Sequence, residues 1–367
     1  MKLLWFTWKD RRNPQGGGAE VVNEELAKRL VADGHQVKFI VAGFRDGAAQ
    51  EERDGFEIIR VGDRWSVYWR AFIYYRKHLS DWPDKVIDEI NAMPFFCRFF
   101  VRQPNGIFIH QLTRMNWFYQ MFFPLNIIGF LAEPIYLWLL SGRTAITVSS
   151  STKAGLVRYG FRKERVEVMR LGLNVAPVAD LAAAVKDPDP TMLALGCVRP
   201  MKRTDHVVRA FELAKREMPE LKLIVAGDMS WDYGKEVCRM VAASPHVSSI
   251  TCHDRVSEKE KLELMRRAHV LCAASVQEGW GLVVPEANSQ GTPAVAYDID
   301  GLRDSVQHGE TGLITASNDP AGLARAVVEL LRDRETYGRL RRRAWEWSKT
   351  LNYDETYGTF SRWLAEL

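Results

Sequence analysis

The sequence is short of the features that would assign a function at once. It has only five cysteines, and no two of them form a Cys-x-x-Cys pair. That spacing argues against a zinc site or a disulfide framework and favours reduced, packed thiols in a cytosolic protein. There is no low-complexity tract and no internal repeat, and the apolar stretch at the N-terminus is too short for a signal peptide. Neither G-x-G-x-x-G nor G-x-x-x-x-G-K-[ST] occurs, so a dinucleotide fingerprint and a P-loop are both absent.

The composition that remains is that of an ordinary globular protein, with 47% apolar and 26% charged residues. A length of 367 residues suits two domains better than one. The net charge of +4 is unevenly distributed. Residues 1–172 carry 25 Lys and Arg against 18 Asp and Glu, a net of +7, and residues 173–367 carry 25 against 28, a net of −3. A basic first half favours binding to phosphate groups, nucleic acid or an anionic membrane surface. Alternatively, its charges are simply solvated at the surface.

Hydrophobic periodicity predicts a two-domain α/β protein. Residues 2–8 read as a strand, Val22, Leu26 and Leu30 as a helix stripe, and residues 36–43 as the next strand, which makes a β-α-β unit. Similar strand patterns recur at 84–88, 106–110, 144–149, 191–198, 221–228, 269–275 and 293–298. We therefore expect two doubly wound Rossmann-like domains at 1–173 and 191–349. A linker would span 174–190, and a C-terminal helix at about 350–367 would pack back on the first domain. Ligands of such sheets bind beyond the carboxyl ends of the strands, here in a central cleft that both domains face.

Three segments carry candidate chemistry at such ends. The glycines Gly16, Gly17 and Gly18 follow a strand and open a helix, where backbone amides attract an anion, although a tight turn would need the same residues. Arg199 and Lys202 follow another strand and could clamp a diphosphate, or be two surface cations. His110 ends the strand at 106–110 and is expected to point into the cleft.

The segment EGWGLVVPEA, residues 278–287, raises a sharper question. Pro285 and Glu286 suit the first turn of a short helix, which needs no further function. That interpretation leaves Glu278 and the two glycines around Trp280 unexplained. Carboxylates in such a loop could accept hydrogen bonds from sugar hydroxyls. Asp298 and Asp300 form a D-x-D pair, to which we assign no metal.

Two aromatic stretches remain open to interpretation. Residues 115–140 have the length of a membrane span, but Pro124, Glu133 and Pro134 interrupt them. The stretch 115–140 is therefore expected to be a membrane-surface or acceptor-binding element, or else a buried helix pair. Residues 64–77 are aromatic and basic, and could stack on bases, lie at a bilayer interface or simply pack.

Taken together, these segments resemble glycosyltransferase family 4, also called group 1, in a bacterial branch. Glu278 and Glu286 match its E-x7-E signature, and GGGAEVVNEELAKRL matches its glycine-rich start. CVRPMKRTDHVVRAF matches its donor-phosphate segment, and GTPAVAYDIDGLRDSVQHGETGLI its region after the second glutamate. VIDEINAMPFF and HQLTRMNWFYQ match the first domain of the branch, so the resemblance covers nearly the whole chain.

The resemblance implies a GT-B fold and a retaining hexosyltransferase that needs no metal or cofactor. Glu286 would bind the ribose, Glu278 a hydroxyl of the donor sugar, and Arg199 and Lys202 the diphosphate. His110 would lie near the transferred sugar. Backbone contacts would come from the remaining donor residues Gly16, Gly17, Gly18, Gly279, Trp280, Gly281 and Leu282. Two departures stand out: Arg114-Met115 replaces the usual Arg-acidic pair, and the segment IVAGDMS at 224–230 lacks the usual second glycine.

The expected partners are a nucleotide-sugar donor, a glycan or lipid-linked acceptor of cell-envelope polysaccharide or glycolipid synthesis, and an anionic membrane surface. No nucleic acid is expected. The expected location is the cytoplasm, including the inner membrane face. Two alternatives are a nucleotide-sugar epimerase of the same fold and a membrane-associated binding protein without catalysis. Loss of Glu278, Glu286, Arg199 or Lys202 would favour the binding protein, whereas all four residues are present.

Overall fold

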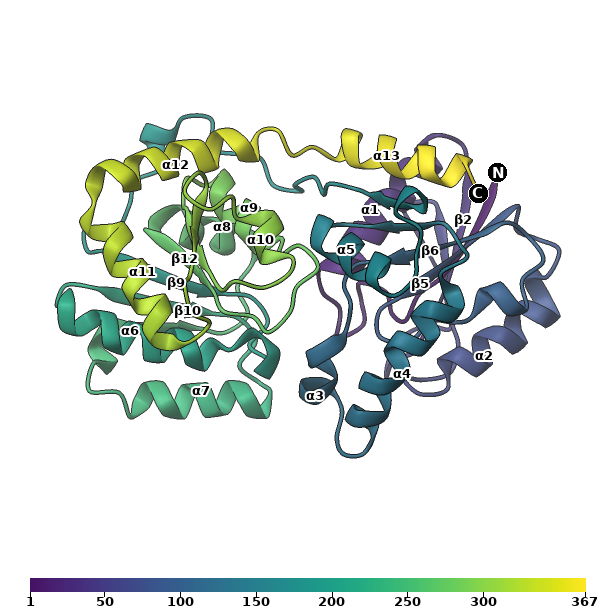
Figure 1. Cartoon of the computed structure of the whole chain (residues 1–367), viewed down its shortest axis with the longest axis horizontal. Coiled ribbons are helices and arrows are strands. Elements are labelled where there is room, and N and C mark those ends of the chain that lie inside the picture. Colours follow the sequence, from purple (N-terminus) through teal and green to yellow (C-terminus); the bar gives the residue numbers. More distant parts are fainter. The chain divides into compact units, whose positions relative to one another are not determined.

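The computed structural model describes all residues, 1–367, and divides into two compact units, each with its own sheet (Figure 1). The first unit comprises Met1–Trp117, Met121–Gly172 and Tyr353–Leu367, and the second Phe118–Gln120 and Leu173–Asn352. All five cysteines are free thiols. No helix combines the length and the apolar character needed to cross a bilayer.

The first unit is built on an eight-stranded sheet of order β3-β4-β2-β1-β5-β6-β7-β8. All neighbouring strands are parallel except β3 and β4, which form an antiparallel hairpin. The strands are β1 (Lys2–Phe6), β2 (Gln36–Val41), β3 (Gln50–Arg53), β4 (Phe56–Arg60), β5 (Lys85–Ile90), β6 (Asn105–Ile109), β7 (Ala145–Thr147) and β8 (Val166–Val168).

The helices of the first unit are α1 (Gly18–Ala32), α2 (Val67–Tyr74), α4 (Leu125–Leu140), α5 (Ser150–Arg158) and α13 (Tyr353–Ala365). The short helix α3 (Trp117–Gln120) begins in the first unit, but Phe118–Gln120 group with the second. Helix α1 buries Val22, Leu26 and Leu30, so the predicted stripe is confirmed. The chain leaves α1 through Gly34 at φ +80°, a backbone conformation that favours glycine. Four short turns differ from α-helix: a π-helical turn, Tyr75–Leu79, continues α2, and 3₁₀ turns lie at Cys97–Phe99, Arg114–Asn116 and Lys163–Arg165.

The last helix, α13, completes the core of the first unit. The Phe360 ring stacks on Trp5 of β1 with 5.5 Å between ring centroids. Gly106 of β6 lacks a side chain where Trp363 comes close, since a Cβ there would lie 2.6 Å from that ring. Lys85 donates from Nζ to the carbonyl oxygen of Leu364 at 2.6 Å. Residues far apart in the chain thus share one apolar layer.

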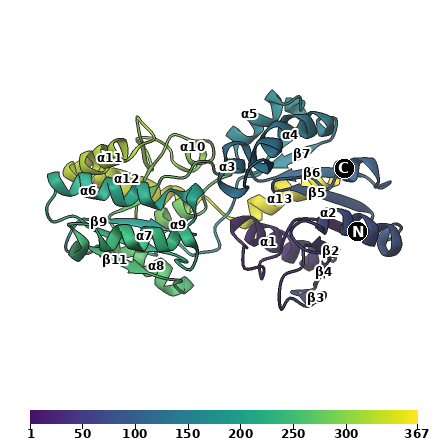
Figure 2. The same cartoon turned by 90° about the horizontal axis from the view of Figure 1, so that it is seen from below.

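The second unit has a six-stranded, fully parallel sheet of order β11-β10-β9-β12-β13-β14. Helices α6 and α11 pack together, as do α8 and α9 (Figure 2). The strands are β9 (Thr191–Leu195), β10 (Lys222–Ala226), β11 (Ile250–His253), β12 (Val270–Ala273), β13 (Ala294–Ala296) and β14 (Gly312–Ile314). The helices are α6 (Thr204–Glu217), α7 (Asp232–Ala242), α8 (Glu258–Arg267), α9 (Val283–Ser289), α10 (Leu302–Ser305), α11 (Pro320–Arg332) and α12 (Arg334–Ser348).

One local expectation needs correction. Residues 174–190, expected as a linker, belong to the second unit and pack on it. Lys186 donates from Nζ to the carbonyl oxygens of Arg266 and Ala268 at 3.0 and 2.7 Å, which satisfies groups at the end of α8. Helix α9 begins at Val283, so Pro285 and Glu286 lie in its first turn, as expected.

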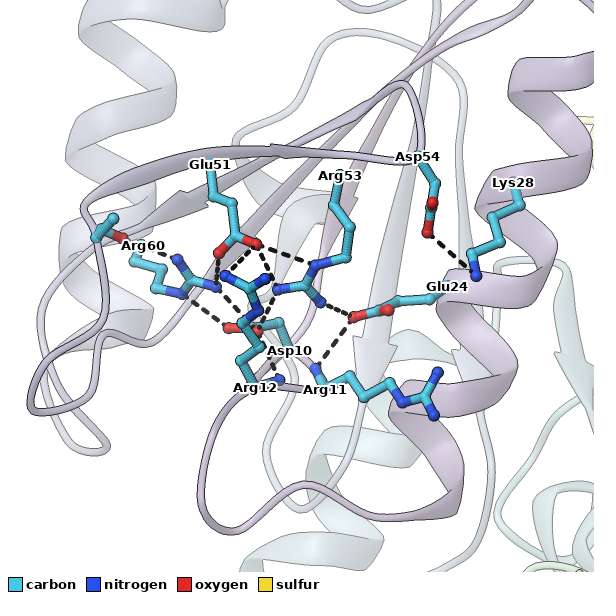
Figure 3. A network of polar contacts seen from close by, with 10 residues as sticks. Asp10, Arg11, Arg12, Glu24, Lys28, Glu51, Arg53, Asp54 and Arg60 are labelled. Atoms are coloured by element: carbon cyan, nitrogen blue, oxygen red, sulfur yellow. Dashed lines mark hydrogen bonds and ion pairs between the residues drawn. The ribbon is translucent and has the colours of Figure 1, made fainter. Parts of the chain in front are cut away.

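A buried ion network ties the loop after β1 to the β3–β4 hairpin (Figure 3). Arg60 donates to both carboxylate oxygens of Asp10, at 2.9 and 3.0 Å, and to Glu51 at 2.8 Å. Arg53 joins Glu51 to Glu24 of α1 at 2.8 and 2.5 Å. The Arg60 side chain is only 1% exposed, so its charge depends on these carboxylates for solvation.

Replacing Arg60 by leucine should destabilise the first unit strongly. The change leaves Asp10 buried without its cation, and breaking one partner of a buried pair costs about 3–5 kcal/mol. Urea unfolding of Arg60→Leu would measure the loss. Arg45→Leu, at an exposed position, is the matched control and should change the free energy of unfolding by less than about 0.5 kcal/mol. Equal effects of the two changes would contradict a stabilising network.

Candidate donor-binding site

Arg199 and Lys202 lie beyond the carboxyl end of β9, on a short 3₁₀ turn, Pro200–Lys202. The amide of Lys202 donates to the carbonyl of Arg199 at 2.8 Å, so the turn fixes the spacing of the two side chains. The amide of Val276, beyond β12, donates to the carbonyl of Met201 at 2.8 Å. Because β9 and β12 are parallel neighbours, the segments that follow them meet at one edge of the sheet.

Glu278 lies at that edge and contacts Lys202 directly. The Lys202 ammonium donates to Oε1 of Glu278, and the hydroxyl of Ser275 donates to the same oxygen at 2.7 Å. The Glu278 side chain is 13% exposed. Lys202, which the resemblance assigns to a diphosphate, is thus held by a carboxylate of the same site. Both contacts are to Oε1, and a carboxylate has a second acceptor oxygen for a sugar hydroxyl.

The backbone around Trp280 approaches its neighbours closely. Gly281 has φ +80°, where other residues are strained. A Cβ on Gly301, beyond β13, would lie 2.4 Å from the carbonyl oxygen of Glu278. Glycine at both positions therefore lets the loop Gly279–Leu282 pack against the loop beyond β13. The Trp280 side chain is buried, so only the backbone of this residue is suited to a ligand.

Glu286 is positioned by α9 and is largely buried, with 18% of its side chain exposed. Lys261 of α8 donates from Nζ to Oε1 of Glu286 at 3.2 Å and also contacts Glu258 at 2.8 Å. Burial raises the pKa of Glu286, and the Lys261 charge opposes that rise. Sequence reasoning missed Lys261 and Ser275. The only signal in the sequence was the pair of glutamates in the E-x7-E spacing, because a buried carboxylate requires a hydrogen-bond donor beside it.

The D-x-D pair has a protein partner. Arg303 contacts Asp298 and donates to Asp300 at 3.0 Å. The Arg303 guanidinium thus bridges the two carboxylates, which form ion pairs within the second unit. The expectation that catalysis needs no metal stays a prediction.

In the first unit, the glycine-rich loop between β1 and α1 is held at both ends. Gly17 donates its amide to Oε2 of Glu20 at 2.6 Å, and Lys9 donates from Nζ to the carbonyl of Gln15 at 2.6 Å. A Cβ on Gly16 would lie 3.0 Å from two backbone carbonyls, so glycine fits best there. Gly18 is the first residue of α1. The Gly16 and Gly17 amides already donate to Asn13 and Glu20, so an anion would have to displace these acceptors.

His110 follows β6 and is buried beside Asn23 and Glu89. Its Nε2 lies 3.2 Å from Oδ1 of Asn23 and 3.7 Å from Oε1 of Glu89. Asn23 and Trp5 in turn donate to Oε2 of Glu89 at 2.7 and 2.8 Å. Burial lowers the pKa of His110 to about 3 and raises that of Glu89 to about 8. Both groups are therefore largely neutral at pH 7, and the Nε2–H tautomer of His110 suits the Asn23 oxygen.

The second unit carries cations and acids beyond the ends of its parallel strands. In the second unit, Arg199 and Lys202 can bind an anionic group, and Glu278 and Glu286 can accept hydrogen bonds from hydroxyls. These groups suit a ligand that carries both a diphosphate and hydroxyls.

Comparison with protein families agrees with this interpretation of the site. Residues 16–176 match the model described as "Glycosyltransferase Family 4", and residues 181–347 match "Glycosyl transferases group 1". The two matches cover both units in order. The chain belongs to the group 1 glycosyltransferases of family 4.

Curated relatives carry related names. N-acetyl-alpha-D-glucosaminyl L-malate synthase of Bacillus anthracis is 23% identical, over 91% of this chain and 89% of that protein. D-inositol 3-phosphate glycosyltransferase of Nocardia farcinica is 29% identical, over 51% of this chain and 44% of that protein. The chain thus spans less than half of the Nocardia protein.

Solved structures share the fold. Sucrose-phosphate synthase from Thermosynechococcus elongatus superposes with a TM-score of 0.79 at 18% identity, covering 98% of this chain and 97% of that one. Anabaena Alr3699/HepE, solved in complex with UDP-glucose, has a TM-score of 0.73 at 16% identity and covers all of both chains. The fold is GT-B, as the resemblance implies.

The buried Glu89 gives the stability of the first unit a distinctive pH dependence. Its pKa is raised in the folded state, so the folded protein binds the extra proton between about pH 4.5 and 8. The stability that this proton contributes is present below pH 4.5 and lost as the pH rises through 8. Each tenfold difference in proton affinity between the folded and unfolded states corresponds to about 1.4 kcal/mol.

Glu89→Gln removes the proton but keeps an oxygen acceptor for Trp5 and Asn23. Relative to the parent chain, this variant should become more stable as the pH rises from 5 to 8, by about a few kcal/mol. Urea unfolding of both proteins at the two pH values measures the change. Parallel pH profiles would contradict a protonated Glu89.

Proposed function

We propose that the protein is a retaining glycosyltransferase that transfers a hexose from a nucleotide-sugar donor to a glycan or lipid-linked acceptor. One observation carries the proposal: Lys202 contacts Glu278 beside Arg199, at the edge where the parallel strands of the second unit end. Cations suited to a diphosphate and a carboxylate suited to a sugar hydroxyl thus come from adjoining loops. Complexes of a GT-B neighbour with UDP-glucose support a donor of this class.

The proposed roles follow the chemistry of each group. Arg199 and Lys202 stabilise the negative charge that grows on the diphosphate as it leaves. Glu278 accepts from a hydroxyl of the hexose, and Glu286 from the ribose. The Gly16–Gly18 loop contacts the diphosphate once its amides are released from Asn13 and Glu20, and His110 lies near the transferred sugar. The bond from the anomeric carbon to the diphosphate breaks, and a bond to the acceptor oxygen forms on the same face. The acceptor's proton passes to the leaving phosphate oxygen.

The acceptor side is proposed to work at a membrane, in cell-envelope polysaccharide or glycolipid synthesis, on the inner face and in the cytoplasm. Helix α4 supports this. Ile128, Leu131, Ile135 and Trp138 are each 55–65% exposed and recur at helical spacing, so an apolar stripe faces outward. Trp69 of α2 is exposed as well, next to the exposed Arg70. Apolar anchors with nearby cations suit an anionic lipid surface.

Measurements of donor binding should distinguish the roles of Glu278 and Glu286. A melting-temperature screen against UDP, GDP and ADP identifies the base, because a bound ligand stabilises the native state. With that diphosphate, Glu286→Gln should bind more weakly, since charge-assisted hydrogen bonds are about twice as strong as neutral ones. Glu278→Gln should bind the free diphosphate normally and use the sugar donor poorly.

Calorimetric titration of each variant with the diphosphate, and rates with the full donor, make the comparison. Glu236→Gln, at an exposed position on α7, is the control and should match the parent in both. No stabilisation by any of the three diphosphates would contradict the proposed donor class. Donor turnover into an epimer without acceptor would instead favour an epimerase.

Membrane binding should depend on salt and on the α4 stripe. We expect co-sedimentation with vesicles that contain anionic lipid at low ionic strength, and weaker binding as salt screens the charges. Leu131→Glu combined with Ile135→Glu should abolish it. Val185→Glu, at an exposed apolar position of the second unit, should not. Absence of co-sedimentation by the folded parent protein would contradict the membrane role.

A further inference from the structure

Trp231 is an exposed indole beside the donor cations and takes no part in the roles proposed for them. It lies between β10 and α7, in the segment Asp228–Trp231 where the family's usual second glycine is missing. Its side chain is 40% exposed, which is high for the largest aromatic residue. An exposed ring at the edge that carries the donor cations is accessible to a ligand bound there.

Close backbone approach brings this loop to Arg199. Strands β9 and β10 are parallel neighbours, and Gly196 donates its amide to the carbonyl of Ala226 at 3.1 Å. A Cβ on Gly227 would lie 1.8 Å from the carbonyl oxygen of Gly196, so only glycine lets the two loops touch there. As a result the Arg199 guanidinium carbon lies 5.8 Å from the centre of the Trp231 ring.

The ring is held in place by its polar edge. Trp231 donates from Nε1 to Oδ2 of Asp228 at 3.1 Å. Arg255, beyond β11, donates to the same oxygen at 2.7 Å, and Ser230 donates its amide to Oδ1 at 3.0 Å. Asp228 thus anchors the indole and ties it to the loop beyond β11. An anchored ring loses little conformational freedom when a ligand stacks on it.

We propose that Trp231 is the stacking platform for the nucleobase of the donor. This inference rests on the proposed function, which places the diphosphate at Arg199. The base of a nucleoside diphosphate lies one ribose away from its phosphates, and Trp231 is the aromatic ring beside the phosphate-binding arginine. Stacking on an aromatic side chain tolerates every base, because every base has a π-face. Trp231 therefore supplies affinity for the nucleotide, and groups that face the edge of the base choose between bases.

Four versions of the chain test the role of the ring: the parent, Trp231→Phe, Trp231→Leu and Trp231→Ala. Calorimetric affinity for the nucleoside diphosphate that the melting-temperature screen identifies should fall about five-fold to a hundred-fold in the alanine and leucine variants, the loss expected when base stacking is removed. Phenylalanine keeps a π-face and should retain most of the affinity. Unfolding of each unliganded variant checks that the fold is intact. If Trp231→Leu bound the nucleoside diphosphate as tightly as Trp231→Phe, the proposal would be overturned, because an apolar contact would then suffice.

Inorganic pyrophosphate separates stacking from an effect on Arg199. Used as a competitor of the nucleoside diphosphate that the melting-temperature screen identifies, it carries the diphosphate charge without a base. Its affinity should be the same in the parent and in Trp231→Ala. An equal loss for the nucleoside diphosphate and for pyrophosphate would show that Trp231 acts through Arg199 and would overturn the stacking role. If the parent binds none of UDP, GDP and ADP, the proposed function itself fails, which is a different result from both.

Discussion

Parallel pairing of β9 with both β10 and β12 is the constraint on which the candidate donor-binding site depends. Since the three strands run the same way, the segments that follow them all emerge at one edge of the sheet. Arg199 and Lys202 follow β9, Trp231 follows β10 and Glu278 follows β12. Had one strand been antiparallel, its loop would lie at the opposite edge. The contact of Lys202 with Glu278, 76 residues apart in the chain, exists only because of this pairing.

Local patterns in the sequence predicted much of the fold. Helix α1 and strands β1, β9 and β12 follow from apolar spacing and turn residues, because each buries a regular face. The β3–β4 hairpin was not predicted. Its first strand, QEER, is wholly polar, and its Arg53 and Glu51 join an ion network that includes Asp10 and Glu24 from outside the hairpin. The segment at 174–190 reads as a linker by composition, yet Lys186 and its neighbours find carbonyl partners on the second unit.

The candidate site could be predicted in its residue types but not in its partners. Glu278, Glu286, Arg199 and Lys202 stand out through motif spacing. Lys261 does not, since one lysine on a charged helix looks like solvent-exposed surface until α8 and α9 are packed together. Asn23 and Glu89 were missed for the same reason: 66 residues separate them, and only the sheet brings them to His110. A buried polar group needs a partner, but the sequence does not say which residue supplies it.

The docking of α13 on the first unit has a consequence for how the protein is made. The N-terminal unit emerges first from a ribosome, and domains generally fold as they are synthesised. Here, however, Trp5 of the first strand is covered by Phe360, and Gly106 by Trp363. Until residues 353–367 have been translated, this unit exposes part of its apolar core. The second unit, complete by Asn352, has every segment of its sheet available earlier. The half of the chain that is made first is thus the half that can finish folding last.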